Sequence, residues 1–232
     1  MYLQSRDAMQ AIKSLALQSI PIAITSTYKG ILLEEKLTPI KVNPDSIIFR
    51  APKKQICASM RNPTIIHSQL LKQSVRAQLQ YIDTHAQEIC LTGFTYTGNY
   101  WNTRDEQRVE PGNPIYATLV LGAQRFRASL VNLSIHGAGL LVYLGDATGR
   151  DLAPKASVEL SFKLTESTEM HIAGDIVSTK FLGYSLEQIG VHLRPSRVQE
   201  TWLENYITRR KMEILDELDR TASVKLNPAV PL

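Results

Sequence analysis

The chain has 232 residues, of which 44% are hydrophobic and 21% are charged, and its formal net charge is +4. This length allows one large domain or two of ordinary size, and the composition excludes a disordered or fibrous chain. The mild excess of basic residues permits an anionic ligand without requiring one, and because these residues are dispersed along the sequence we expect no DNA binding.

An amphipathic helix is predicted at the start of the chain, with Ser5 as its N-cap and with Met9, Ile12 and Ala16 on one face. Pro21 lies beyond its expected end, because proline does not fit inside a helix. The apolar residues that follow recur with a period of two, which is typical of strands.

A compact, mostly antiparallel β unit is predicted over residues 20–96. A hairpin turns at Lys29 and Gly30, and the segment from Val75 to Tyr81 alternates apolar and polar residues, which indicates a strand with one buried face. Further short strands are expected at IKV, IIF and QICAS.

Residues 96–114 are rich in Gly, Pro and Asn, which is typical of a linker, and we place the domain boundary near residue 98. Short apolar runs separated by turn residues follow, and they predict a second antiparallel sandwich or barrel. These runs are IYATLVL, RFRASLVNLS, GLLVYL, SVELSFKL, MHIAGDIVSTK and QIGVHL.

A helix is predicted to follow Pro195 and to run to about Arg220, with Ser196 and Gln199 forming a capping box. Its apolar residues form an early and a later group that face partly different directions. Either the early group packs on the barrel while the later one meets a partner, such as a second copy of the chain, or both belong to one irregular stripe. The early group is Val198, Trp202, Leu203 and Tyr206, and the later group is Ile214, Leu215 and Leu218.

These elements predict a mainly β protein with two antiparallel β-barrel-like domains. We expect a β-rich N-terminal domain over 1–97, a linker over 98–114, a barrel with its C-terminal helix over 115–220 and a loose tail over 221–232.

Two motifs contain residue types suited to binding an anionic nucleotide. The linker motif RDEQR places Arg104 and Arg108 four residues apart, and an arginine fork pairs bidentately with guanine or phosphate. The motif NLSIHG places Asn132, Ser134 and Gly137 where a strand turns. Asn and Ser bring hydrogen-bonding groups, and Gly allows close approach of the backbone. We expect the apolar neighbours Val131, Leu133 and Ile135 to point into the barrel and the polar set to be displayed.

An RxxxR motif before a small barrel, followed by [D/N]xSxxG, resembles the signature of the PilZ family, and the resemblance covers about residues 98–208. It implies a six-stranded barrel closed by a C-terminal helix, with cyclic di-GMP as ligand and no other cofactor. Residues 1–97 resemble, less specifically, the N-terminal domain of flagellar-brake type PilZ proteins.

The resemblance also implies roles for single residues. Arg104 and Arg108 would grip guanine and phosphate, and Asn132, Ser134 and Gly137 would hold a guanine edge and the neighbouring phosphate. Further contacts are expected from Trp101, Thr103 and Gly139.

The linker motif departs from the family pattern at two points. Thr103 stands where many members have another arginine, which leaves the number of bound ligands open. Asp105 and Glu106 lie inside the motif and would pair with its arginines when no ligand is bound. Exposed pairs of this kind contribute only about 0 to 1 kcal/mol, so they should not block binding.

The sequence supports a receptor in which cyclic di-GMP binding changes the arrangement of the two domains and so regulates motility, biofilm or secretion machinery through a protein target. The alternative is a PilZ-like adaptor that binds proteins and no nucleotide. No catalytic motif is present, so we expect no enzyme.

No transmembrane helix or secretory signal is expected, and Cys57 and Cys90 match no zinc motif, which favours buried, reduced thiols in a cytoplasmic protein. The histidines are scattered, so no metal site is predicted.

Overall fold

The computed structural model describes residues 2–18, 20–60, 63–71, 73–97, 106–145 and 152–225. The chain divides into two compact units. The first comprises Met1–Asp105 and Ile214–Leu232, and the second comprises Glu106–Glu213. The division expected from the sequence, at residues 97, 114 and 220, stays a prediction about which segments fold independently.

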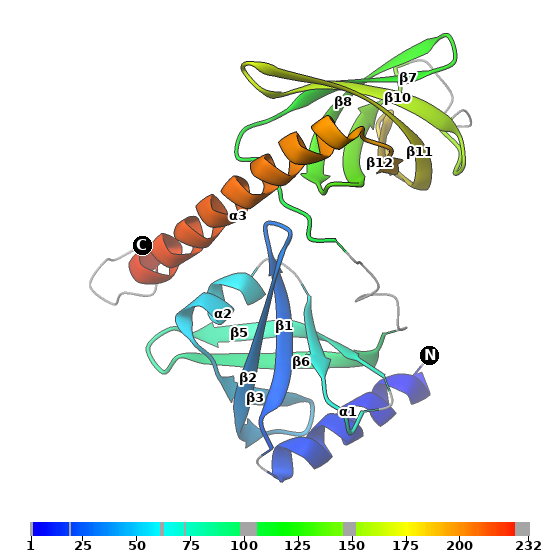
Figure 1. The fold of residues 1–232 in the computed structure, drawn as a ribbon. Coiled ribbons are helices and arrows are strands. Elements are labelled where there is room, and N and C mark those ends of the chain that lie inside the picture. Colours follow the sequence, from blue (N-terminus) through cyan, green and yellow to red (C-terminus); the bar gives the residue numbers. More distant parts are fainter. Residues whose placement is uncertain are drawn as a thin grey trace. The chain divides into compact units, whose positions relative to one another are not determined.

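The first unit contains a closed antiparallel barrel with the strand order β1-β2-β3-β6-β5-β4 (Figure 1). Its core contains large apolar side chains that are fully buried, among them Ile24, Phe49 and Leu91. The elements are α1 (Tyr2–Leu17), β1 (Ile22–Tyr28), β2 (Ile31–Val42), β3 (Ser46–Arg50), α2 (Lys53–Ser59), β4 (Thr64–His67), β5 (Val75–Asp83) and β6 (Glu88–Tyr96).

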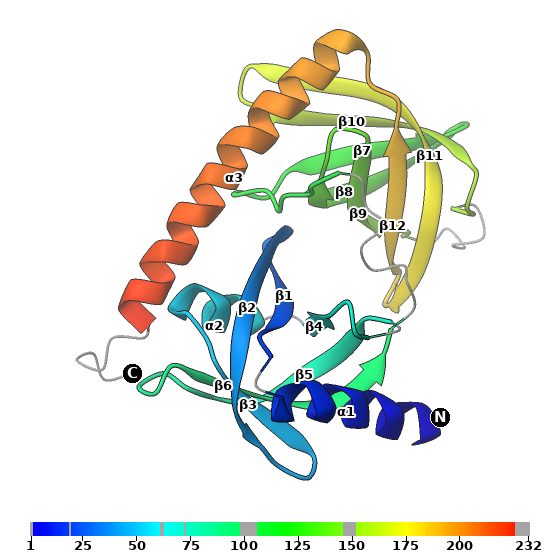
Figure 2. The same ribbon diagram turned by 60° about the horizontal axis from the view of Figure 1, so that its bottom comes forward.

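The predicted hairpin and N-terminal helix are both present in this unit. Lys29 and Gly30 have φ angles of 48° and 88°, as the tight turn between β1 and β2 requires. Helix α1 packs on β6 and β2 and buries Ile12 and Ala16 (Figure 2). It begins at Tyr2, so Ser5 lies inside the helix and the expectation that Ser5 is the N-cap is wrong.

The segment QICAS is helical, as part of α2, and not a strand as expected. All five residues from Gln55 to Ser59 are buried, so neither face of this segment is exposed to solvent. A short run that is buried all round has no periodicity that separates a strand from a helix. The same limitation applies to β4, whose first three residues are buried and which the sequence pattern did not reveal.

The second unit contains another closed antiparallel barrel, with the order β10-β11-β12-β9-β8-β7. All the strands predicted for this region are present, and the fold class, two antiparallel barrels with a helix after the second, is confirmed. The elements are β7 (Tyr116–Leu121), β8 (Gln124–Leu133), β9 (Gly137–Tyr143), β10 (Ser157–Thr165), β11 (Thr168–Gly183), β12 (Leu186–Leu193) and α3 (Arg197–Lys225).

Helix α3 begins with the predicted capping box. The Ser196 N–H donates to Gln199 Oε1 at 2.9 Å, and the Gln199 N–H donates to Ser196 Oγ at 3.4 Å. The helix continues to Lys225, beyond the expected end near Arg220. Its buried positions recur every three or four residues, whereas Val198 and Trp202 are exposed. The buried positions up to Arg210 belong to the second unit and those from Ile214 onwards to the first, which does not fit a single stripe on one barrel. The buried positions are Leu203, Ile207, Arg210, Ile214, Leu218 and Ala222.

Two further features follow from the described parts of the chain. Neither Cys57 nor Cys90 forms a disulfide with a described residue, and both are buried. None of the helices in the described ranges has the length and apolar character needed to cross a membrane.

Candidate functional site

The NLSIHG motif forms the connection between β8 and β9, and its own hydrogen bonds fix the turn. The Ser134 N–H donates to the Gly137 carbonyl at 2.7 Å, and the Ser134 hydroxyl reaches the same oxygen at 3.3 Å. The His136 carbonyl accepts a bond from the N–H of Leu193, at the end of β12. The turn is therefore held against the neighbouring strand.

A β-bulge precedes the turn and changes which side chains are buried. Leu130 pairs with Leu140 and Asn132 pairs with Gly139, so Val131 is the extra residue. Val131 is exposed, and the expectation that it points into the barrel is wrong. The simple alternation assumed for this strand fails at the bulge.

The burial of the motif's polar residues also differs from the expectation that they are displayed. Ser134 is only 2% exposed, and Asn132 is half-buried. Leu133 is fully buried as expected, whereas Ile135 is partly exposed.

Arg108, the second arginine of the linker motif, lies beside this turn. A Cβ atom added to Gly137 would lie 2.9 Å from Ser134 Oγ and 3.5 Å from Nη2 of Arg108. The backbone of the next residue, Val109, is bonded in both directions to Leu133, with N···O distances of 2.9 and 3.0 Å. The linker motif and the barrel motif, 24 residues apart from Arg108 to Asn132, therefore meet at Gly137.

The segment is anchored again two residues beyond Arg108. Arg210 of α3, only 3% exposed, donates from Nε to the Glu110 carbonyl at 2.9 Å and from Nη1 to Glu213 at 3.0 Å. Its guanidinium lies close enough to Gly112 that a Cβ there would be 3.3 Å from Cζ. The polypeptide that follows Arg108 is thus fixed to both the barrel and the helix.

The Asn132 amide lies against Gly139 in the neighbouring strand. A Cβ at Gly139 would approach Asn132 Nδ2 and Oδ1 to 2.8 Å, so glycine is needed for this placement. Asn132 Oδ1 is buried and accepts no hydrogen bond from the described part of the chain. Buried acceptors are nearly always paired, so this atom is suited to a donor supplied by a ligand.

His136 lies between two carboxylates at the same turn. Glu106 accepts the His136 backbone N–H at 2.9 Å, and its other oxygen pairs with the Nδ1 atom of the ring. The His136 Nε2 atom lies 3.2 Å from Glu200 in the first turn of α3. The sequence predicts that Glu106 pairs with arginine, and no local pattern links Glu106 to His136.

The pKa values of this cluster favour the charged pair. Burial raises the pKa of Glu106, but hydrogen bonds from the His136 N–H, its ring and Ser134, with the nearby imidazolium charge, hold this pKa below its usual range. For His136 the hydrogen bond to Glu106 raises the pKa, burial lowers it and Glu200 raises it again, so the net change is upward.

Three of the predicted contacts, Trp101, Thr103 and Arg104, lie outside the described residues and stay predictions. The others meet at one turn: the structure brings Arg108, Ser134 and Gly137 together, with Asn132 and Gly139 on the adjoining strands.

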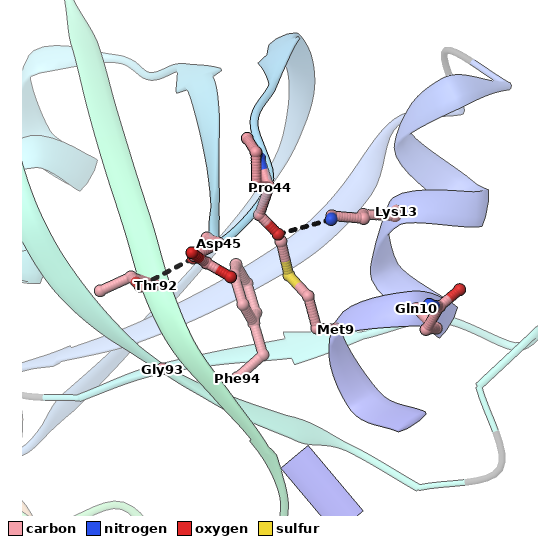
Figure 3. A pocket seen from close by; sticks show the side chains of 8 residues that line it. All are labelled: Met9, Gln10, Lys13, Pro44, Asp45, Thr92, Gly93 and Phe94. Carbon is pink, nitrogen blue, oxygen red and sulfur yellow. Dashed lines mark hydrogen bonds between the residues drawn. The ribbon is translucent and has the colours of Figure 1, made fainter. Parts of the chain in front are cut away.

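A pocket of about 500 Å³ in the first unit is a second candidate site (Figure 3). It lies between α1, the β2–β3 turn and β6, and Met9 and Phe94 line its apolar part. Lys13 Nζ is bonded to the Pro44 carbonyl, and Asp45 lies on the same wall. This pocket contains charges of both signs, and the Lys13 amine is already bonded. It therefore suits an anion less well than the turn of the NLSIHG motif, called the motif turn below.

The geometry of the motif turn suits an anionic ligand with a hydrogen-bonding planar group. A guanidinium, a hydroxyl, a turn backbone and an unpaired amide oxygen all lie within one small region. Within the described ranges no group of three or more His, Cys, Asp or Glu side chains is arranged to hold a metal ion.

The second half of the chain matches a known protein family. The model of the PilZ domain family matches residues 102–209, which include both motifs. No curated protein is similar enough to count as a relative.

Several solved structures resemble the whole chain at low identity. MrkH of K. pneumoniae in complex with c-di-GMP is 12% identical, with 94% of this chain and 96% of that chain covered and a TM-score of 0.44. YcgR of Escherichia coli in complex with c-di-GMP is 14% identical, with 94% and 96% covered and a TM-score of 0.46. The Bacillus subtilis inhibitor of motility MotI/DgrA is 10% identical, with 84% and 97% covered and a TM-score of 0.43.

Proposed function

Residues 102–209 form a PilZ domain, and we propose that this domain makes the chain a receptor for cyclic di-GMP. The observation that carries the proposal is the meeting of the two motifs at Gly137, where the Arg108 guanidinium lies beside the turn that holds Ser134. The unpaired Asn132 Oδ1 on the adjoining strand adds an acceptor without a partner in the described chain.

Each group matches a feature of the ligand, which contains two guanines and two phosphates. Arginine pairs bidentately with guanine O6 and N7 or with phosphate oxygens. The amide and amino N–H groups of guanine would satisfy Asn132 Oδ1. We assign these contacts to Arg108, Asn132, Ser134 and Gly137, with Arg104 as the second arginine, and we keep Trp101, Thr103 and Gly139 as additional contacts.

The proposed consequence of binding is a change in how the two units are arranged. The ligand would bind the linker motif and the barrel motif together, and it would favour whichever arrangement allows both contacts. The output would be an altered surface that a protein target recognises, in motility, biofilm or secretion machinery. We place this activity in the cytoplasm.

Calorimetric titration with cyclic di-GMP tests the proposal, with GMP as the control ligand. We expect wild-type protein to bind and Arg108→Ala to lose about tenfold to a hundredfold in affinity, the usual cost of a lost bidentate guanine contact. Arg127→Ala is the matched control, because Arg127 is an exposed arginine of β8 in the same barrel. Wild-type protein that gives no heat and no thermal shift would contradict the receptor function.

One observation favours the adaptor alternative. The chain's own residues already cover the turn, with Ser134 only 2% exposed and Glu106 bonded to His136. An adaptor would bind its protein target without nucleotide, and Arg108→Ala would leave that binding unchanged.

A further inference from the structure

Glu106 occupies hydrogen-bond donors of the motif turn. Its Oε2 atom accepts the His136 backbone N–H at 2.9 Å, and its Oε1 atom pairs with the His136 ring. The Ser134 hydroxyl lies at the same turn, where it reaches the Gly137 carbonyl at 3.3 Å. Both oxygens of one anionic group are therefore held at the turn where the ligand is proposed to bind.

These donors have the character of an anion-binding site. A backbone N–H, a hydroxyl and an imidazolium each form strong, charge-assisted bonds to carboxylate or phosphate oxygens. The Arg108 guanidinium lies beside the same turn. Its Nη2 atom is 3.5 Å from the position that a Cβ atom on Gly137 would take. A ligand phosphate that approached Arg108 and Gly137 would need the donors that Glu106 now occupies.

The imidazole is held in place from its other side. Glu200 of α3 lies 3.2 Å from Nε2, and the His192 ring of β12 lies beside it, with ring centroids 6.4 Å apart. Among the described residues, the titratable groups that face His136 are thus Glu106, Glu200 and His192. Because Glu200 and His192 keep the ring in position, a departure of Glu106 would leave the donors of the turn in place for another anion.

We propose that Glu106 is an internal competitor of the ligand: it binds the Ser134–Gly137 turn in the ligand-free protein and must leave His136 when an anionic nucleotide binds. This inference rests on the proposed receptor function. The competition is intramolecular, so it acts at a high effective concentration and lowers affinity without any change in the ligand contacts themselves.

The strength of this competition is limited by exposure. The side chains of Glu106 and His136 are 34% and 41% exposed, and ion pairs of this kind are screened by water. Removing the competitor should therefore raise ligand affinity by up to about fivefold, not by orders of magnitude.

The test compares cyclic di-GMP affinity for wild type, Glu106→Gln and Glu106→Ala by calorimetry. The matched control is Glu110→Gln, which removes the same charge four residues further along the same segment and so reports any general charge effect on a dianionic ligand. Tighter binding by both Glu106 variants and unchanged binding by the control is the expected result. A purely structural role of Glu106 would give weaker binding instead.

The outcomes separate this inference from the receptor function. If wild type binds and both Glu106 variants bind equally or more weakly, the competitor role is overturned while the receptor function stands. If the control gains as much as the Glu106 variants, the effect is one of net charge and the competitor role is again overturned. If neither wild type nor any variant binds, the receptor function itself fails and the competitor role with it.

A ligand-free measurement adds an independent readout. NMR titration of the His136 ring should show a lower pKa in Glu106→Gln than in wild type, because the contact that raises it is lost. An unchanged His136 pKa would show that Glu106 does not occupy the turn in solution, and would overturn the inference.

Discussion

At the scale of single residues, Asn132 and Gly139 depend on each other. A Cβ at Gly139 would approach the Asn132 amide atoms to 2.8 Å, so Gly139→Ala should displace the amide from its place in the site. We expect this variant and Asn132→Ala each to lose about tenfold to a hundredfold in cyclic di-GMP affinity, as for other lost base-edge contacts. Calorimetric titration measures both losses.

The double variant distinguishes an indirect effect from a direct one. With alanine at 132 the added Cβ at 139 has room, so the double variant should bind no more weakly than Asn132→Ala alone. Additive losses would show that Gly139 acts through something other than Asn132. The thermal midpoint of each protein serves as the control for folding.

The His136 cluster predicts how stability depends on pH. The folded-state pKa of His136 is raised above its ordinary value of 6.5, so its contribution is fully present below that value and is lost as pH rises through the raised pKa. The pKa of Glu106 is lowered from 4.5, so its contribution is lost only as pH falls through the lowered pKa. The pair of Glu106 and His136 should therefore stabilise the second unit most between the lowered pKa of Glu106 and the raised pKa of His136.

Thermal unfolding between pH 5 and 9 checks this dependence. Relative to His136→Gln, wild type should be more stable near neutral pH and below, and should lose this advantage as pH rises. The difference should not exceed about 4 °C, because half-exposed pairs contribute at most about 1 kcal/mol. His171→Gln, an exposed histidine beside Glu169, is the control and should follow wild type. Parallel curves for His136→Gln and wild type would contradict the prediction.

The resemblance to the PilZ family was sufficient to predict that Arg108, Ser134 and Gly137 belong to one site, and the structure places them at one turn. It was not sufficient for the contact between Glu106 and His136, which are 30 residues apart and meet only through the shape of the turn. The exposure of Val131 was also missed, since a bulge adds one residue without leaving a mark in the hydrophobic pattern.

At the scale of elements, the first turn of α3 depends on its capping box. Ser196 and Gln199 satisfy each other's backbone N–H groups, and Gln199 Nε2 also donates to the His171 carbonyl of β11 at 2.8 Å. Replacing a capping serine by alanine costs about 1 kcal/mol. Ser196→Ala should therefore lower the thermal midpoint of the second unit by a few degrees, as measured by circular dichroism.

Thr201→Ala is the control for this prediction. It removes a hydroxyl from the same helix, but that hydroxyl bonds only the Arg197 carbonyl one turn earlier, at 3.1 Å. Its midpoint should stay close to that of wild type. Equal decreases of the thermal midpoint in Ser196→Ala and Thr201→Ala would mean that the capping box does not anchor the helix.

The sequence predicts those elements in which apolar residues recur at a regular spacing. The strands of the second barrel alternate clearly and were all found, and the box residues marked the start of α3. Helix α2 was mistaken for a strand because residues Gln55–Ser59 are all buried. Its assignment depends on the barrel around it, which a local pattern does not contain.

At the scale of the whole molecule, the chain has two compact units, and the described residues of the proposed ligand site, from Arg108 to Gly139, lie in the second of them. A ligand that binds the folded state alone stabilises it by about 2.7 kcal/mol at a concentration of a hundred times Kd. Scanning calorimetry should therefore show two transitions, one of which moves upward by several degrees with cyclic di-GMP.

The assignment of the moving transition can be checked with the variants already described. It should be the one that Ser196→Ala lowers, since that substitution lies in the second unit. GMP at the same concentration should move neither transition. A shift in the transition that Ser196→Ala leaves unchanged would place the ligand in the first unit.

The lack of side chains at Gly137 and Gly139 also affects how proteins of this kind can change during evolution. A single base change converts a glycine codon to that of alanine, serine or valine. At either position the new Cβ would meet Ser134 Oγ or the Asn132 amide, and not the barrel backbone. One point mutation would thus silence a receptor and leave an intact barrel free to evolve as a scaffold for protein partners.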